Sequence, residues 1–255
     1  MISFTGPLHG NDPFERFLHR LDKFAPLDNA ARDALRRAVQ RGPLVSSEHE
    51  LQIDASTDVT IVLSGWVCHF RLLDNGRRQI TSIVVPGDFA DFGFLSGRTT
   101  HTQSVATSRS QLGRIRLRQF ADLTEQYPNI MKAALHAAAA EAAISRERVI
   151  TLGVRSALER VAHLLCEFYH RLSAVDLVSS TGTYDLPMTQ AELGDALGLS
   201  TVHVNRTVQV LRRRGIISIQ NGKATIHDLG QLADLAGFDP SYLDNAKPSD
   251  ETLFA

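Results

Sequence analysis

The chain has 255 residues, of which 43% are hydrophobic and 22% charged, and its formal net charge is -1. This composition predicts a soluble globular protein, and the length favours two modest domains. No apolar run approaches the roughly 20 residues that a membrane-spanning helix needs. The first residues lack a charged start followed by an apolar core, so we expect no secretory signal and a cytoplasmic location.

The chain contains two cysteines, Cys68 and Cys166. Two are too few for a disulfide framework, and they lack the paired spacing of a zinc site. We expect both to be reduced and buried.

Residues 13–39 carry helical patterns that break around Pro26, and residues 44–117 change to short alternating segments separated by Gly, Asp and Asn. That texture is typical of an all-β unit, which we expect to be a small antiparallel barrel or jelly roll. In its clearest hairpin, Trp66, Cys68, Phe70 and Leu72 share one face before a turn at residues 74–76. We assign residues 1–125 to this domain, including its N-terminal helices.

Residues 120–152 are dominated by strong helix formers, and we expect a long helix over residues 126–153. Ala137, Ala140 and Ile144 would form a seam of small residues at spacings of three and four. This pattern favours dimerisation along the helix. The alternative is a helix that packs on its own barrel.

A further helix is expected over residues 156–172, and a capping box then opens a short one, because Glu192 follows Thr189 by three residues. Leu193 and Leu197 give this helix an apolar stripe, and Gly198 ends it. A turn of three to four residues with a glycine, followed by another helix, is typical of the helix-turn-helix, whose second helix enters the DNA major groove.

The second helix of this motif begins after Ser200 and places Val204, Val208 and Leu211 on one face. The other face is free to touch a partner. It carries Thr201, Val202, Asn205 and Arg206.

After Gly215, residues 216–220 and 223–227 alternate like strands around Asn221-Gly222, a pair that suits a tight hairpin turn. Residues 186–227 hold five Lys or Arg but two Asp or Glu, so positive charge concentrates where phosphates would lie. We therefore predict a winged helix within a domain of residues 154–240, with a tail over 241–255. The alternative is a plain helical and β-hairpin pair with solvated arginines.

The complete prediction is an α+β chain with an N-terminal antiparallel β-barrel or jelly roll, a long dimerisation helix and a C-terminal winged helix-turn-helix. This order resembles the Crp/Fnr family of bacterial transcription regulators over residues 14–227. The resemblance is most specific in "VVPGDFADFGFL" and "MTQAELGDALGLSTVHVNRTVQVLRRRGII". It implies an effector-binding barrel, a homodimer, a palindromic double-stranded DNA operator and contact with RNA polymerase.

The resemblance also implies roles for individual residues. Arg206 matches the family arginine that reads a guanine, and Thr201, Val202 and Asn205 would lie beside it at the bases. Thr201 and Val202 differ from the residues of cyclic-AMP-responsive and oxygen-responsive members, so we expect a different operator. The positions that would hold the DNA backbone are Thr189, Gln190, Ser200, His203 and Lys223.

The effector pocket departs further from the family. Asp91 falls where cyclic-AMP binders have a glutamate for the ribose, and His101-Thr102 falls where they have an Arg-Ser pair for the phosphate, which disfavours cyclic AMP. Ser145 and Arg146 occupy the places that reach the adenine. The pocket candidates are Phe89, Asp91, Phe92, Gly93, His101, Thr102, Ser145 and Arg146. A cyclic-nucleotide-gated regulator with a rearranged pocket is the alternative, and the sequence implies no cofactor.

Two histidine patterns raise the question of a metal site. His163, Cys166 and His170 recur at helical spacings, and Cys68-His69 with His101 would suit haem or a cupin-like metal. We favour packing for the first, and adjacent strand residues point to opposite faces in the second. The rival class is a metal-dependent barrel enzyme with a DNA-binding tail. Because the sequence shows no paired carboxylates or nucleophile triad, we expect no metal and no enzyme activity.

Overall fold

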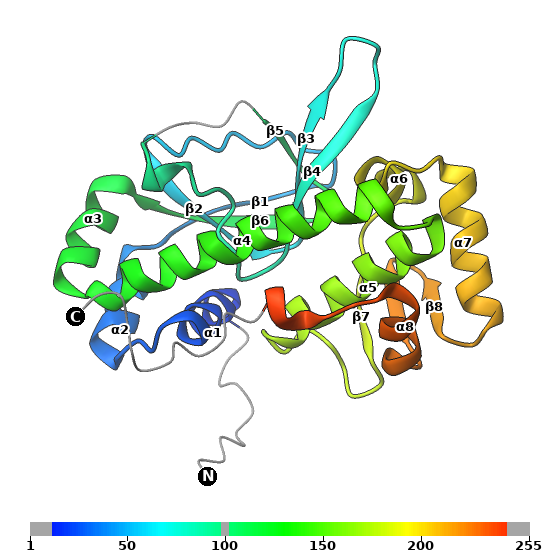
Figure 1. Ribbon diagram of the computed structural model, residues 1–255. Helices are drawn as coiled ribbons and strands as arrows, with labels where there is room; N and C mark the ends of the chain where they lie inside the picture. The colour runs from blue at the N-terminus through cyan, green and yellow to red at the C-terminus, as the bar shows by residue number, and fades with distance from the viewer. Residues whose placement is uncertain (1–11, 98–101, 244–255) are drawn as a thin grey trace.

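The computed structural model describes residues 12–97 and 102–243 of the chain. Two lobes are joined by helix α4 (Pro128–Val154), which runs across the whole molecule with the N-terminal lobe along one part of it and the C-terminal lobe at its far end (Figure 1). Among the described residues, the helices include none with the length and apolar character required to traverse a bilayer.

The N-terminal lobe begins with helices α1 (Pro13–Phe24) and α2 (Asn29–Ala38). Asp12 and Asp28 cap them by accepting hydrogen bonds from the backbone N–H groups of Phe14 and Ala31, at 3.0 and 2.7 Å. The helices separate at residues 25–28, which confirms the expected break around Pro26.

The strands of this lobe form two antiparallel three-stranded sheets. The first has the order β1 (Gln40–Val45), β6 (Ser110–Arg116), β2 (Asp58–Ser64), and the second has the order β4 (Arg78–Val84), β3 (Val67–Leu72), β5 (Gln103–Ala106). A short 3₁₀ turn, η1 (Gly93–Leu95), follows β4. Buried side chains from both sheets share one core cluster. The described strands therefore form a jelly-roll sandwich, which confirms one of the two predicted forms, and they do not close into a barrel in this part of the chain.

The hairpin of β3 and β4 departs from the alternation expected for it. Its register shifts between His69 and Phe70, Phe70 is half-buried, and Leu72 is 58% exposed. The hairpin projects beyond the sheet towards the C-terminal lobe (Figure 1). The inward face expected to include Leu72 therefore ends at Phe70, which still packs against the core, because no second layer covers the projecting tip.

Helix α3 (Leu117–Gln126) precedes α4, and the two are separated at Tyr127 because Pro128 lacks the N–H needed to continue the helix. Within the chain, Ala137, Ala140 and Ile144 are only 8, 6 and 8% exposed. They face a space between α4, α1 and the segment after β4. The predicted dimer seam is therefore wrong, because these small residues let α4 approach its own domain closely.

The C-terminal lobe contains α5 (Ala157–Ser173), α6 (Gln190–Leu197), α7 (Thr201–Arg213), α8 (Leu229–Ala236) and the turn η2 (Pro240–Tyr242). Its sheet has the order β7 (Thr183–Asp185), β9 (Lys223–Ile226), β8 (Ile217–Gln220). Strand β7 follows a stretch rich in Ser, Thr and Gly. It forms there because Tyr184 buries its ring and donates a hydrogen bond to the Leu165 carbonyl at 3.1 Å.

Candidate nucleic-acid interface

The helix-turn-helix is fixed by local contacts that the sequence predicts. Thr189 and Glu192 form the expected capping box, with the Glu192 N–H donating to Thr189 Oγ1 at 3.1 Å. Gly198 ends α6 in the left-handed region at φ 62°. A Cβ at Gly194 would lie 2.5 Å from the Leu199 carbonyl oxygen, so the turn packs directly on α6. The angle between α6 and α7 is thereby held by backbone contacts.

Helix α7 has the two faces that its sequence predicts. Ser200 caps it by accepting a hydrogen bond from the His203 N–H at 3.3 Å, and Val204, Val208 and Leu211 are buried. Val202 is 64% exposed although it is apolar. The outward face carries Thr201, Val202, Asn205 and Arg206, all exposed. This face is available to a partner.

The exposed face of α7 forms one side of a shallow groove. Gln190 of α6 lies beside it, and Asn205 donates a hydrogen bond from Nδ2 to Gln190 Oε1 at 3.1 Å. Gln209 and Arg213 extend the same groove, and sequence reasoning missed both. The signal was present, because positions 202, 206, 209 and 213 continue the helical period.

Positive charge surrounds this groove. Arg206, Arg212, Arg213 and Arg214 are all exposed. The wing turn has the expected left-handed backbone, with φ 51° at Asn221 and 71° at Gly222. Lys223 beside it lies 2.6 Å from Asp185, but that pair is more than half exposed and therefore weak. Lys223 remains available to an anionic partner.

A pocket in the N-terminal lobe contains most of the predicted effector residues. Phe89, Asp91, Phe92, Gly93 and Thr102 line it, whereas His101 lies outside the described residues. The other lining side chains, which sequence reasoning missed, come from β3, β4, the segment after β4 and α4. They are His69, Thr81, Ser82, Val84, Ala90 and Glu141.

Ser145 and Arg146 do not line this pocket, contrary to expectation. Both are exposed on α4, and Glu141 is the α4 residue at the pocket wall. The reason is helical geometry, since the buried Ile144 and Arg148 take the inward face one and two turns after Glu141.

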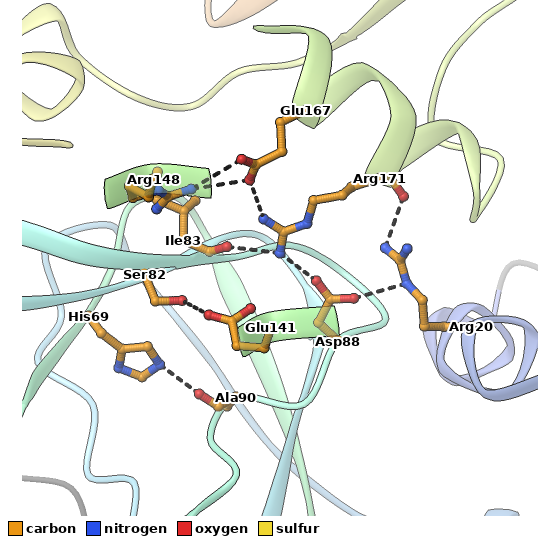
Figure 2. Close-up of polar contacts among 10 residues, drawn as sticks. All are labelled: Arg20, His69, Ser82, Ile83, Asp88, Ala90, Glu141, Arg148, Glu167 and Arg171. Atoms are coloured by element: carbon orange, nitrogen blue, oxygen red, sulfur yellow. Dashed lines mark hydrogen bonds and ion pairs between the residues drawn. The ribbon is translucent and has the colours of Figure 1, made fainter. Parts of the chain in front are cut away.

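The described lining of the pocket is acidic. Glu141 accepts a hydrogen bond from Ser82 Oγ at 2.7 Å (Figure 2), and Asp91 accepts one from the Gly93 N–H at 2.5 Å. His69 is buried and uses both ring nitrogens, contacting Ser104 Oγ at 2.8 Å and the Ala90 carbonyl at 2.6 Å. Two carboxylates and no Lys or Arg thus face the described part of the pocket.

A buried network of charges joins the two lobes (Figure 2). Arg171 of α5 lies 2.7 Å from Asp88 and 3.0 Å from Glu167, and it donates to the Ile83 carbonyl at 2.9 Å. Arg20 of α1 contacts Asp88 at 2.9 Å, and Arg148 of α4 contacts Glu167 at 3.1 Å. The network therefore links α1, the turn after β4, α4 and α5.

A second polar contact joins the projecting hairpin to the helix-turn-helix. Arg78 Nε lies 2.7 Å from Asp195 Oδ2, and Gln79 Nε2 donates to the Asp195 carbonyl at 2.6 Å. Because Asp195 is on α6, the hairpin is attached to the helix that supports α7.

The first histidine pattern, His163 and His170, has a packing role. His163 lies 5.0 Å from the ring of Phe238 and 6.0 Å from that of Tyr242, and His170 lies 5.2 Å from Phe238. Burial lowers the pKa of His163 to about 4, and burial raises the pKa of the Cys166 thiol to about 12. These groups build an aromatic cluster with residues 238–242, at the start of the expected tail.

A β-sandwich lobe with a pocket, a long helix and a winged helix with an exposed basic face define a DNA-binding regulator of the sensor-linked type. Comparison with known proteins gives the same result. The "Cyclic nucleotide-binding domain" family matches residues 51–127, and the "Crp-like helix-turn-helix domain" family matches residues 159–235.

Among curated relatives, the chain is 34% identical over 188 residues to the nitrogen fixation regulation protein FixK of Bradyrhizobium diazoefficiens, covering 72% of this chain and 76% of FixK. It is 31% identical over 185 residues to the transcriptional activator FnrL of Cereibacter sphaeroides, covering 71% and 73%. The fold resembles the solved structure of FixK2 from Bradyrhizobium japonicum, with a TM-score of 0.67 and 24% identity over 77% of this chain and 96% of that one. The chain belongs to the Crp/Fnr family of DNA-binding transcription regulators.

Proposed function

We propose that the chain binds a palindromic operator as a homodimer through α7, and that it does so without cyclic AMP. The observation that carries this proposal is the exposed face of α7, which presents Thr201, Val202, Asn205 and Arg206 in one basic groove with Gln190. The apolar side chain of Val202 is 64% exposed, so it contributes little to packing within the monomer. A DNA-binding helix has a use for such a side chain.

We assign base recognition to the residues in this groove and phosphate binding to the residues at its margins. Arg206 reads a guanine with its planar guanidinium, and Gln209 and Arg213 extend the contacts along the groove. The residues that hold phosphates are Thr189, Gln190, Ser200, His203 and Lys223, which are all exposed. Such contacts position the protein without selecting sequence.

The dimer uses the outward face of α4 in place of the stripe first predicted. Leu135, Ala142 and Val149 recur every seven residues and are exposed, with Leu135 at 48% and Val149 at 71%. Ala139, Arg146 and Gly153 form the companion positions of the same heptad. Two copies packed along this seam would direct two α7 helices to half-sites about 34–36 Å apart.

The pocket argues against cyclic AMP as its ligand. A phosphodiester would face the Glu141 carboxylate, and the described lining of the pocket includes no Lys or Arg to bind its charge. The names of the relatives FixK and FnrL mention no cyclic nucleotide, and FnrL is called a transcriptional activator. We infer that this chain likewise acts on transcription through RNA polymerase.

The test is selection of bound sequences from random duplex DNA by the purified protein, with and without cyclic AMP. One palindrome recovered in both arms supports the proposal. Recovery only with the nucleotide would overturn cyclic-AMP independence, and recovery of no common sequence would overturn operator recognition.

Arg206→Ala tests the assigned base contact. The free energy of specific binding should weaken by about 1–3 kcal/mol per half-site, and the protein should discriminate less among the bases at one base pair. Arg212→Ala is the matched control, since Arg212 is exposed on the same helix but outside the groove. An Arg206→Ala variant that selects the unchanged palindrome would contradict the assignment.

A further inference from the structure

A separate cleft lies between the N-terminal lobe and the wing. Its N-terminal side is formed by the turn before β3, the turn before β6 and helix α1, and its C-terminal side by the wing turn at Asn221-Gly222 and by Asp185. It shares no lining residue with the effector pocket or with the groove on α7. Nothing in the regulator's DNA-binding role accounts for it.

Arg16 at this cleft differs from the other partly buried arginines. In the described chain, the half-buried arginines are Arg16, Arg20, Arg32, Arg78, Arg114, Arg155 and Arg160. Each of them except Arg16 has a hydrogen bond or ion pair to a described residue. A guanidinium carries five donors, and Arg16 is not among the described residues that have a buried side-chain nitrogen without a partner, so its donors remain accessible. Arg16 is therefore suited to an acceptor that enters the cleft.

The rest of the lining favours an anion with an apolar body. Arg109 adds a second, exposed guanidinium, and Asp185 is the one acidic residue of the described lining. The apolar part of the lining includes Leu177 and Pro187, which are half-buried, and Trp66 and Leu172, which are each 2% exposed. Two unpaired cations beside an apolar wall match a small molecule that has both a charged and a hydrocarbon part.

We propose that this cleft binds a small organic anion, with a phosphate or carboxylate held by Arg16 and Arg109 and its apolar part against Leu177 and Pro187. Both lobes line the cleft, so an occupant contacts the wing and the sensor lobe at once. A ligand that prefers one relative placement of the lobes shifts the population towards it and changes DNA affinity reciprocally. The cleft is thereby a second regulatory site.

The chain provides its own reporter, because Trp66 is its single tryptophan. The probe is phenyl phosphate, which combines an aromatic ring with a phosphate, titrated into the full-length protein without DNA. We expect a saturable change in tryptophan emission, matched by calorimetric heat, with a Kd of about 1 mM or tighter. Phenol and inorganic phosphate, each having half of the required chemistry, should bind more weakly.

The variants Arg16→Gln and Arg109→Gln should each weaken phenyl phosphate at least about tenfold, the loss expected for a charge-assisted hydrogen bond. Arg37→Gln is the matched control, since Arg37 is exposed and lies outside the cleft. Unchanged circular dichroism and thermal midpoint would show that the variants are folded.

Absence of saturable binding, or equal binding by all three variants, would overturn the proposal. If Arg109→Gln instead weakened binding to all DNA sequences while phenyl phosphate had no effect, the arginines would belong to a DNA phosphate surface. Because the titration contains no DNA, its result is independent of whether the operator assignment holds.

Discussion

Replacing Arg171 by Met should destabilise the protein strongly although Arg171 lies outside both proposed binding sites. The side chain is 5% exposed and makes contacts of 2.7 Å to Asp88, 3.0 Å to Glu167 and 2.9 Å to the Ile83 carbonyl. Methionine keeps the apolar stem and removes every donor. Asp88 would then rely on Arg20 alone and Glu167 on Arg148 alone.

Breaking a buried ion pair by removing one partner costs about 3–5 kcal/mol, because a desolvated charge is left uncompensated. In this variant Asp88 keeps Arg20 at 2.9 Å and Glu167 keeps Arg148 at 3.1 Å. We therefore expect the free energy of unfolding to fall by about 3 kcal/mol. For a chain of this size that corresponds to a fall of about 6–12 °C in Tm. Against a typical total stability of about 5–15 kcal/mol, the loss is large.

Urea unfolding followed by circular dichroism measures this loss. Arg116→Met is the control, because Arg116 is 65% exposed and lies 3.3 Å from Asp58, where a surface pair contributes at most about 1 kcal/mol. Arg171→Lys should fall between the two, since an ammonium cannot reproduce three directed contacts. A loss below about 1 kcal/mol for Arg171→Met would refute the reasoning, because the network would then be no better than a surface pair.

Three other outcomes follow from the structure. Val149→Asp should dissociate the dimer in sedimentation, whereas Ala140→Asp should unfold the monomer because Ala140 is 6% exposed within its own chain; a dimeric Val149→Asp would place the interface elsewhere. Lys223→Gln should weaken binding to all DNA sequences alike and lower the slope of log affinity against log salt by about one per subunit; loss confined to the operator would mean that the wing reads bases. Burial lowers the pKa of His163 to about 4 from 6.5, so as the pH falls the unfolded chain is protonated before the folded one. The free energy of unfolding should therefore decrease by up to about 3 kcal/mol as the pH falls from 6.5 towards 4. His163→Phe should flatten that decrease, and an unchanged pH profile in this variant would assign the proton to another group.

Features set by neighbouring residues in the sequence were predictable. The capping box at Thr189, the left-handed turn at Asn221-Gly222 and the two faces of α7 all depend on contacts within a few residues. The predicted outward face of α7 was therefore confirmed by its exposure. The assignment of individual bases and phosphates to that face stays a prediction.

Features set by distant contacts were not predictable. Helix α4 is rich in alanine on every side, so periodicity alone did not show which stripe faces the domain and which faces outward. The inward position of Glu141 and the pairing of Asp88 with Arg171, 83 residues apart, depend on how the lobes pack. Strand β7 likewise depends on distant contacts, because it pairs with β9 about 40 residues later and is held by the buried Tyr184.

The contacts between the lobes constrain how a signal can reach α7. Asp195 on α6 is held by Arg78 and Gln79 of the projecting hairpin, and Gly198 connects α6 to α7 through a turn packed on Gly194. The buried charges fix α5 to the turn that leads into the effector pocket at Phe89 (Figure 2). The hairpin is attached to α6 and the buried network to α5, which are different elements of the C-terminal lobe. Moving α7 relative to the sensor lobe therefore requires that one attachment breaks or that the C-terminal lobe moves as a whole. The hairpin contact is half-exposed and the Arg171 network is buried, so the hairpin contact is the cheaper to break. Trp66 and Ile83 of the sensor lobe also share one hydrophobic core with Phe168 of α5, so the buried network lies beside an apolar contact between the lobes, and a displacement of α6 would break the hairpin contact first.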